Sequence, residues 1–345
     1  MISQTFLSEA STRQIFTIGN NSSKEEWRRT NDNIHLSQTS NYMLILDGLY
    51  MRGVIEIVPT HVVREGGGFM VRRPFRMGKV MSPFLLIDEM GPVNYGPGEA
   101  KGAPWHPHRG FETVTYLLDG RMRHEDSEGN TGELNPGDVQ WMTAGRGIIH
   151  NEEPHKEFLR TGGKMHGFQI WVNLPAANKM MKPRYQEVPA SESPLVEQDG
   201  IWARVIAGEC MGKSSNIDTK IPITLIHVRM DEDARLVQQI ESNLNGMIYV
   251  FGGEISIQNE IRVRKHPIPF GIEAKQQIKD GELAILSEGS EINIRSKSPS
   301  EFLILAGPEL NEPIERYGPF VMNTREEIHQ AVLDYQNGTF ATKND

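Results

Sequence analysis

Four side chains that can bind a metal occur as two pairs with the same spacing. His106 and His108 form the first pair, and His150 and Glu152 form the second pair further along the chain. Successive side chains of an extended strand alternate between its faces, so both members of each pair project to one side. If the two strands face each other inside a small antiparallel barrel, three imidazoles and one carboxylate surround a single point. The pattern predicts a metal site with positions left open for water or substrate.

The ligand types favour a borderline divalent metal without selecting one. Mixed nitrogen and oxygen ligation with open positions favours iron(II), with manganese, nickel, copper and zinc as competitors. A single His-x-His sequence often arises by chance, but here a second pair with the same spacing follows. The pairs are separated by turn sequences, namely Asp119-Gly120, Glu128-Gly129-Asn130 and Asn135-Pro136-Gly137, which is typical of strands in one antiparallel unit.

The elements that position these pairs are predicted to be short strands in two successive units. The chain of 345 residues is long enough for two cores, and its 33 glycines and 20 prolines fit many strands joined by turns. We expect a disordered polar extension over residues 1–50, a metal-binding domain over 51–180 and a linker over 181–200. A second domain is expected over 201–322, and a helix with a short tail over 323–345.

The helix near the C-terminus is predicted from its ends and from its apolar positions. Thr324 and Glu327 form a capping box, and Gly338 provides a stop. Apolar residues recur at helical spacing at positions 328, 331, 332 and 335. We expect this helix to pack against a barrel rather than to bind a partner.

The second half of the chain repeats the strand pattern of the first half but not its metal ligands. TYLLDGRMRHED parallels IYVFGGEISIQN, as expected for a duplicated barrel. The place of His150 to Glu152 is taken by Ile294-Arg295-Ser296. We therefore expect the second barrel to be free of metal, with His227 as a hydrogen-bonded core residue and His266 in a basic loop.

Several other side chains have weaker signals. His124 is expected to face solvent at a charged hairpin tip, and Cys210 is expected to be a buried apolar residue rather than a reactive thiol. His166 precedes an apolar strand, and one hypothesis makes it a hydrogen-bond donor to the metal ligands. Arg109 should alternate to the face opposite His108 and form an ion pair with a carboxylate of the neighbouring strand.

Longer sequence stretches resemble a known family. HPHRGFETVTYLLDG, HEDSEGNTGELNPGDVQWMTAGRGIIHNEEP, GFQIWVNLP and GPFVMNTREEIHQAVLDYQNG are similar to segments of the pirin family, and the resemblance spans Val54 to Phe340. It implies an all-β bicupin, with two tandem jelly-roll barrels and a short C-terminal helix. It also implies iron(II) in the first barrel, bound by the residues that match the family's ligands: His106, His108, His150 and Glu152.

The common cupin pattern provides a rival carboxylate. In that pattern the ligand is the glutamate four residues after the second histidine, which is Glu112 in this chain, whereas pirins use the residue that matches Glu152. Simple alternation places Glu112 on the same strand face as His108. Glu112 is therefore either a competing ligand or a hydrogen-bond partner of the ligands.

The resemblance implies two functions of different classes. The first is an iron-dependent flavonol oxygenase of the quercetin 2,3-dioxygenase type, in which Glu152 binds the metal and accepts a proton from the substrate hydroxyl. The alternative is a non-enzymatic, iron-dependent nuclear transcription cofactor or signalling adaptor. Its partner would be a transcription factor or, in a plant, a G-protein α subunit. For either function we expect a monomer in the nucleus and cytoplasm.

Composition excludes some classes of function. The formal net charge of -9 disfavours direct nucleic-acid binding, because neutralised phosphates supply most non-specific affinity. No run of 18 apolar residues occurs, so no membrane span is predicted. The single cysteine, Cys210, cannot form an internal disulfide, and this favours a reducing compartment.

Overall fold

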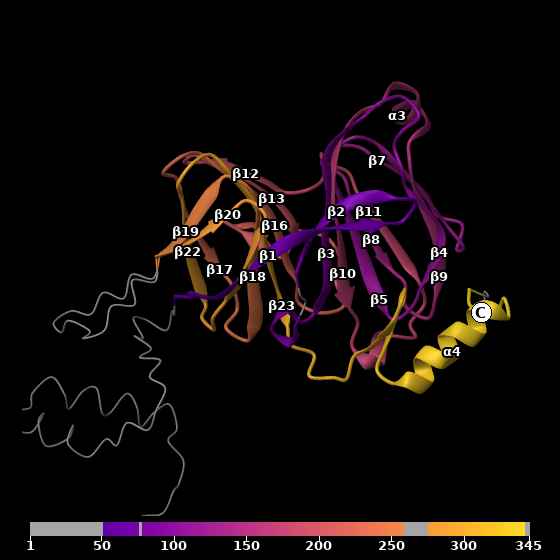
Figure 1. Ribbon diagram of the computed structural model, residues 1–345. Helices are drawn as coiled ribbons and strands as arrows, with labels where there is room; N and C mark the ends of the chain where they lie inside the picture. The colour runs from indigo at the N-terminus through magenta and orange to yellow at the C-terminus, as the bar shows by residue number, and fades with distance from the viewer. Residues whose placement is uncertain (1–50, 76–77, 259–274, 342–345) are drawn as a thin grey trace, which may run out of the picture. The chain divides into compact units, whose positions relative to one another are not determined.

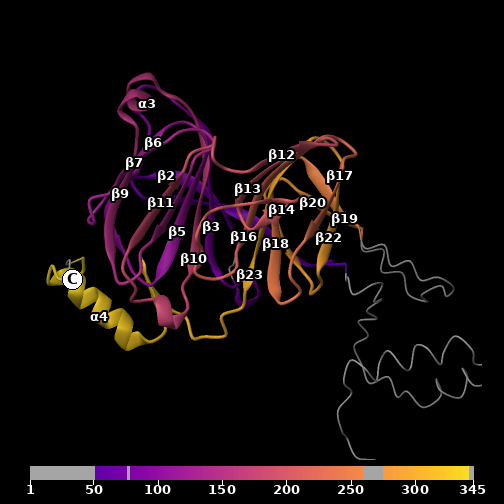
Figure 2. The ribbon, with the colours of Figure 1, turned by 180° about the vertical axis from the view of Figure 1, so that it is seen from behind.

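The structure is a computed structural model that describes residues 51–75, 78–258 and 275–341. Its strands form two barrels, which Figure 1 and Figure 2 show from opposite sides. Together with the helix near the C-terminus, this confirms the predicted all-β fold of two barrels and a short terminal helix. Residues 1–50 and His266, for which the sequence made predictions, lie outside the described residues.

The first barrel consists of two antiparallel sheets. The larger sheet has the order β11-β8-β5-β10-β3-β2, and the smaller sheet has the order β4-β9-β6-β7. Short helices lie between some of these strands. The bounds are β2 Phe69–Pro74, η1 Lys79–Met81, β3 Phe84–Tyr95, β4 Ala103–His108, β5 Phe111–Asp119, β6 Met122–Asp126, β7 Thr131–Leu134, β8 Val139–Thr143, β9 Ile148–Pro154, α3 Lys156–Thr161, β10 Gly163–Asn173, η2 Ala176–Asn178 and β11 Arg184–Val188.

The second barrel has the same plan. Its larger sheet has the order β21-β18-β23-β16-β13-β12, and its smaller sheet has the order β17-β22-β19-β20. A two-stranded ribbon of β14 and β15 lies beside them. The bounds are β12 Leu195–Gln198, β13 Ile201–Ala207, β14 Glu209–Cys210, β15 Lys213–Ser214, β16 Thr224–Met230, β17 Arg235–Gln239, β18 Leu244–Gly252, β19 Glu254–Gln258, β20 Lys275–Lys279, β21 Glu282–Leu286, β22 Glu291–Ser296 and β23 Ser300–Pro308.

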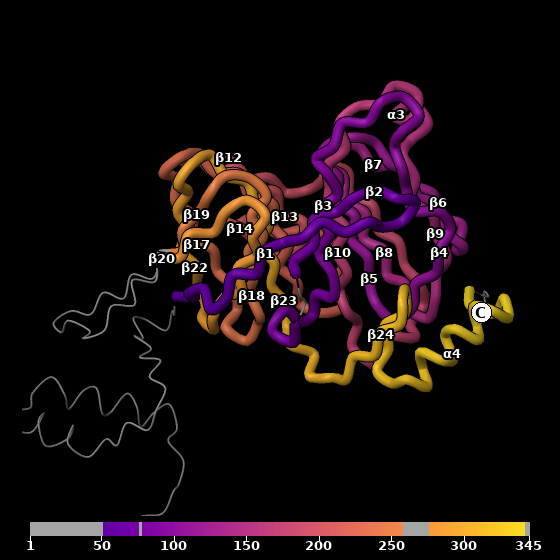
Figure 3. The backbone as a smooth tube through the Cα atoms, in the orientation of Figure 1, coloured from indigo at the N-terminus to yellow at the C-terminus, as the bar shows by residue number. Residues whose placement is uncertain are grey.

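Strand β1 (Val54–Glu65) joins the two barrels. Its first half pairs with β21 of the second barrel, and its second half pairs with β2 of the first barrel. Figure 3 shows this strand in indigo crossing from one barrel to the other. Among the described residues the two larger sheets therefore form one continuous sheet of 13 strands.

The two faces of β10 in the larger sheet of the first barrel have different surroundings. In β10, Phe168, Ile170 and Val172 belong to an apolar cluster shared with the second barrel. The alternate residues Gln169 and Trp171 line a cavity inside the first barrel. Period-two alternation thus separates an apolar face that holds the barrels together from a face that is free to carry chemistry.

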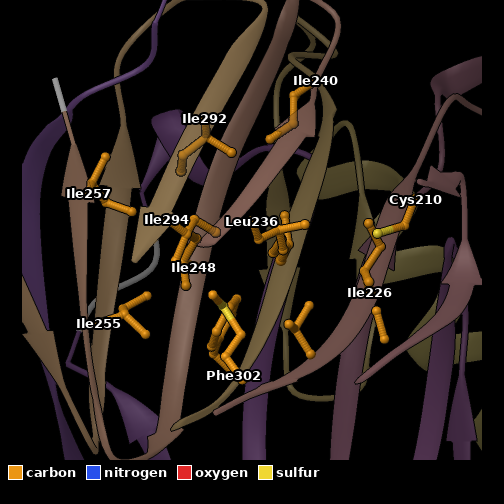
Figure 4. Packing of buried hydrophobic residues seen from close by; sticks show 14 of the residues in the cluster. Cys210, Ile226, Leu236, Ile240, Ile248, Ile255, Ile257, Ile292, Ile294 and Phe302 are labelled. Carbon is orange, nitrogen blue, oxygen red and sulfur yellow. The ribbon is translucent and has the colours of Figure 1, made fainter. Parts of the chain in front are cut away.

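The interior of the second barrel is an apolar core. Figure 4 shows Ile226, Ile248, Ile294 and Phe302 packed in this core, with Cys210 at its side. Each fully buried side chain of this size stabilises the fold by about 1.5–3 kcal/mol relative to its exposed state. Cys210 is buried, as predicted, and burial raises the pKa of its thiol to about 11.

The end of the chain returns to the first barrel. It forms β24 (Glu315–Tyr317), β25 (Phe320–Met322) and α4 (Arg325–Gln336). The predicted capping box of Thr324 and Glu327 is present. Phe320, Ala331 and Phe340 pack with Ile149 of β9. The helix therefore covers the strand that carries His150, as Figure 1 shows in yellow.

The structure divides the chain differently from the predicted domains at two places. Residues 181–200, expected to be a linker, contain β11 and β12, and these strands pair with β8 and β13. Residues 315–322, expected in the second barrel, form the β24-β25 hairpin, whose Phe320 bridges to Arg109 of the first barrel. Both differences come from pairings over long sequence distances.

No helix in the described part of the chain is long and apolar enough to cross a membrane.

Candidate metal centre

The register of two strands brings three histidines together. In the antiparallel pair of β4 and β9, His106 lies opposite His150. One ring nitrogen from each of His106, His108 and His150 lies within 4.8 Å of the others. The ring centres of His106 and His150 are 4.3 Å apart, and those of His108 and His150 are 5.0 Å apart. The three imidazoles thus converge as the spacing predicted.

Backbone carbonyls determine which nitrogen is free in two of these rings. A carbonyl oxygen can only accept a hydrogen bond, so the Nδ1 atom facing it must carry the proton. The Nδ1–H of His106 donates to the Pro104 carbonyl at 2.8 Å, and that of His108 donates to the Pro319 carbonyl at 3.4 Å. In the neutral form of each ring the unprotonated nitrogen is therefore Nε2, which a metal can bind.

The third ring is oriented by a buried chain of hydrogen bonds. The Gln140 amide nitrogen donates to His124 Nδ1 at 3.2 Å, so this nitrogen of His124 must be an acceptor. His150 Nδ1 lies 3.4 Å from the same atom, and with this tautomer of His124 its Nδ1–H shares the single lone pair with Gln140. The remaining Nε2–H of His124 points to Asp126 at 3.4 Å. His150 is thus left with an unprotonated Nε2.

Glu152 lies next to this chain of hydrogen bonds. Its Oε1 accepts from the Thr115 hydroxyl at 2.7 Å and from Gln140 Nε2 at 3.4 Å. One atom that could bind a metal from each of His124, His150 and Glu152 lies within 4.8 Å of the others, and these three residues form a second group. The two groups share His150, which links Glu152 to the three-histidine cluster.

The electrostatics and the donor set fit a metal ion. Burial lowers the pKa of His108 and His150 well below the usual value for histidine, and the neighbouring imidazoles lower it further. Both rings are therefore neutral at neutral pH, which is the form that binds a metal. The Nε2 atom of His150 is buried and has no hydrogen-bond partner. A buried polar atom of this kind needs a partner, and a metal ion would provide one.

Glu112 does not face this cluster, so the expectation that it shares a face with His108 is wrong. Gly110 has a positive φ of 89°, and the chain leaves β4 and enters β5 at this point, which resets the alternation. Glu112 instead accepts a hydrogen bond from Thr143 at 2.6 Å and lies 3.6 Å from Arg184. Burial raises the pKa of its carboxyl group.

His124 also differs from the prediction, because it is fully buried rather than exposed to solvent. Its ring stacks on Tyr185, with the ring centres 4.9 Å apart. The signal that could have identified it is its i, i+2 spacing with Asp126, since a strand projects both to one side. The charged residues around the hairpin favoured a solvent-exposed position for His124 instead.

Two further expectations were wrong in their details. His166 donates to Glu89 at 2.9 Å and is not among the residues that line the cavity, so the hypothesis that it supports the ligands fails. Arg109 does form an ion pair, but its partner is Asp334 of α4 at 2.7 Å rather than a residue of a neighbouring strand. Neither partner could be read from local spacing.

A cavity of about 510 Å³ opens beside the cluster. His106, His108 and Glu152 line one part of it. Its walls also contain the aromatic side chains of Phe69, Tyr95, Trp105 and Trp171. This volume lies within the range of roughly 300–1,000 Å³ that is typical of small-molecule sites. A small ligand in the cavity would therefore contact the candidate metal ligands.

Comparisons with known proteins agree with this architecture. The family model described as Pirin matches residues 68–172, and the model described as Pirin C-terminal cupin domain matches residues 225–341. Human Pirin is 42% identical over 278 residues, which cover 79% of this chain and 88% of that protein. These matches confirm the predicted bicupin fold.

Two further relatives have names that state an activity. A Pseudomonas aeruginosa protein described as a putative quercetin 2,3-dioxygenase is 40% identical over 298 residues, which cover 84% of this chain and 98% of that protein. The crystal structure described as quercetin 2,3-dioxygenase from Acinetobacter baumannii matches with a TM-score of 0.76 and 36% identity. That match covers 84% of this chain and 98% of the other chain.

Proposed function

The chain belongs to the pirin family, and from this premise we propose that it binds one iron(II) ion in the first barrel and acts as a flavonol oxygenase of the quercetin 2,3-dioxygenase type. The observation that carries the proposal is the convergence of three imidazoles beside a cavity of about 510 Å³. The names of the relatives from Pseudomonas and Acinetobacter support the choice of reaction.

The proposed ligands are His106, His108, His150 and Glu152. Three imidazoles and one carboxylate suit a borderline divalent metal, and positions not taken by protein favour iron(II) over a closed structural zinc site. Bound iron would supply Lewis-acid and redox chemistry toward dioxygen and an oxygen-bearing substrate.

Glu152 is the proposed proton acceptor. Thr115 and Gln140 both donate to its Oε1, so the carboxylate is held in place at the wall of the cavity. A carboxylate held there can take the proton of a substrate hydroxyl, which makes the substrate oxygen a better electron donor. The aromatic walls, which include Phe69, Trp105 and Trp171, would align a planar ring and exclude water.

The test begins with purification under anaerobic conditions, followed by metal analysis and measurement of oxygen uptake with quercetin. We expect about one iron per chain and uptake that matches the loss of quercetin. His150→Ala should lose most of the iron, because it removes the Nε2 donor that has no other partner. His329→Ala is the matched control, since His329 is exposed on α4 and should keep both iron and activity.

The outcomes separate the two functions from the sequence analysis. Full iron occupancy in His150→Ala would refute the site. Iron binding in the parent protein without oxygen uptake would refute the oxygenase and favour the iron-dependent adaptor. A transcription factor or G-protein partner, the monomeric state and a location in the nucleus and cytoplasm remain predictions.

A further inference from the structure

Three basic side chains line the cavity, but among the described residues only one of them forms ion pairs. These side chains are Arg73, Lys101 and Arg316. Arg73 donates to Asp88 and to Glu65, each at 2.6 Å. Within residues 51–75, 78–258 and 275–341, neither Lys101 nor Arg316 has a side-chain hydrogen bond or an ion pair. The cavity wall thus contains two exposed basic side chains to which no carboxylate of the described residues is hydrogen-bonded.

Arg316 is held beside the candidate metal centre by the C-terminal hairpin. It lies on β24, and the turn after this strand contains Pro319, whose carbonyl accepts from His108. The guanidinium carbon of Arg316 is 4.6 Å from the centre of the Trp171 ring. The Trp171 ring centre is in turn 5.2 Å from that of His108. A guanidinium lying over an indole keeps its N–H edge free to donate.

The pairing of charges around the cavity leaves the guanidinium of Arg316 open to an anionic group. Its carboxylates are Glu65, Asp88 and Glu152. The first two are bound by Arg73, and the third lies beside His150 and is held by Thr115 and Gln140. Asp88 and Glu65 lie near enough to attract Arg316, but among the described residues neither is hydrogen-bonded to it. Because guanidinium groups bind carboxylates through two parallel hydrogen bonds, the free N–H edge of Arg316 provides a specific place for one.

We propose that the cavity binds a planar aromatic compound that carries a carboxylate, with Arg316 donating to the carboxylate and Lys101 adding a second positive charge. The ring lies among Phe69, Trp105 and Trp171, and the carboxylate lies at the β24 side of the cavity. This inference goes beyond the proposed function, because a flavonol such as quercetin carries no carboxylate. It rests on the cavity and its charges, so it can be tested without metal.

The experiment measures binding to the metal-free full chain by titration calorimetry. The probes are 2-naphthoate and its neutral isostere 2-naphthamide. We expect the parent protein to bind the acid at least about tenfold more tightly than the amide, because a charge-assisted pair with Arg316 is made only by the acid. The preference should weaken with added salt, because salt screens charges at a cavity that is open to solvent.

Variants test whether Arg316 causes the preference for the acid over the amide. Arg316→Gln should bind both probes alike, and Arg316→Lys should keep part of the preference, since it keeps the charge but not the planar fork. Arg325→Gln is the matched control, because Arg325 is exposed on α4 and does not line the cavity. It should bind both probes as the parent protein does.

Three results would overturn the inference: equal binding of both probes by the parent protein, binding of neither probe, or an unchanged preference in Arg316→Gln. The first two results need no variant, so a folding defect in Arg316→Gln cannot hide them. An acid preference in a protein that consumes no oxygen with quercetin would refute the oxygenase but support this inference. The failures of the two proposals are therefore distinguishable.

Discussion

At the residue scale, the candidate site is a set of imidazoles whose proton positions are determined by their neighbours. Pro104 and Pro319 accept from two of the rings, and His124 accepts from the third. In the neutral form of each ring, the unprotonated nitrogen is thereby Nε2. Hydrogen bonds that hold one nitrogen of a metal-binding histidine also orient its ring and raise its basicity. The chemistry of the site thus depends on residues that never touch the metal.

The two carboxylates near the histidines are predicted to have different effects on metal binding. Glu152→Gln should weaken iron(II) binding by at least about tenfold, because it removes a negative charge beside His150. Glu112→Gln should change the affinity by less than about twofold, since Glu112 contacts Thr143 and lies on the other face of β5. Paired anaerobic titrations of the metal-free variants measure both values. A larger loss of affinity in Glu112→Gln than in Glu152→Gln would show that Glu112 is the ligand, as in the common cupin pattern.

His124 is predicted to act on the metal through the tautomer of His150. His124→Phe keeps a ring that can stack on Tyr185 but removes the acceptor for His150 Nδ1–H. We expect iron(II) affinity to fall by about 10–100-fold, in the range known for such supporting groups. The ¹⁵N NMR spectrum of the metal-free protein should also show His150 moving toward the Nε2–H tautomer.

A second variant serves as the control for His124. His124→Gln keeps an oxygen that can accept from His150, so it should restore part of the affinity and of the original tautomer. A His150 tautomer that is the same in His124→Phe and in the parent protein would contradict the role assigned to His124.

At the element scale, the site depends on how strands and the terminal helix meet. Gly110 allows the turn from β4 into β5, and a Cβ atom at this position would clash with the carbonyl of Val321. The Lys179 ammonium donates to the carbonyls of both Gly110 and Val321. The C-terminal arm is therefore part of the support of the first barrel, although it follows the second barrel in sequence.

The ion pair between Arg109 and α4 is predicted to stabilise this arm. Asp334→Asn would leave the buried Arg109 guanidinium without its carboxylate, while its contacts with the Arg146 carbonyl and with Phe340 remain. We expect a loss of about 1–3 kcal/mol in the free energy of unfolding, below the value for a fully buried pair because Asp334 is partly exposed. Urea unfolding and hydrogen exchange of the α4 amides measure the effect.

A surface pair provides the control for that measurement. Lys164 and Asp119 form an ion pair at 2.8 Å, with half of the lysine side chain and 40% of the aspartate side chain exposed. Asp119→Asn should therefore cost less than about 1 kcal/mol. Equal destabilisation of Asp334→Asn and Asp119→Asn would show that the ion pair with Arg109 does not hold α4 on the first barrel.

At the scale of the whole described molecule, the two barrels share an apolar interface that contains a few buried polar groups. Tyr116 of the first barrel donates its hydroxyl proton to His227 Nδ1 of the second barrel at 2.7 Å. His227 Nε2–H donates to Glu301 at 2.9 Å. His227 is fully buried and hydrogen-bonded, as the sequence predicted, and this chain of contacts connects the barrels.

His227 is predicted to make folding depend on pH. Burial lowers its pKa from 6.5 to about 4, so between these values the unfolded chain binds a proton that the folded chain does not. The free energy of unfolding should therefore fall as pH falls from 6.5 to 4, by about 3 kcal/mol for this group. Urea unfolding of the parent protein and of His227→Gln across this range isolates the contribution.

The test compares the free energy of unfolding of the parent protein with that of His227→Gln at each pH. His108 and His150 also have lowered pKa values, but they are present in both proteins and cancel. His227→Gln can still accept from Tyr116 and donate to Glu301, and it does not titrate. Parallel stability curves from pH 6.5 to 4 would show that His227 does not control the acid response.

Local spacing alone determined much of the fold and part of the candidate site. Period-two alternation identified the strands and placed the side chains of His106 and His108, and of His150 and Glu152, on common faces. The capping box of Thr324 and the helix after it were also readable, because their contacts lie within a few residues. The resemblance to the pirin family implied two barrels, and a faint duplicated strand pattern agreed with it.

Only the tertiary structure decided which groups share the site and what supports them. The turn at Gly110 moved Glu112 away from the histidines, and strand pairing brought His124 into the interior. Asp334 reached Arg109, and Arg316 reached Trp171, across long stretches of chain. These contacts depend on register and on packing between distant segments, which alternation along a single strand does not encode.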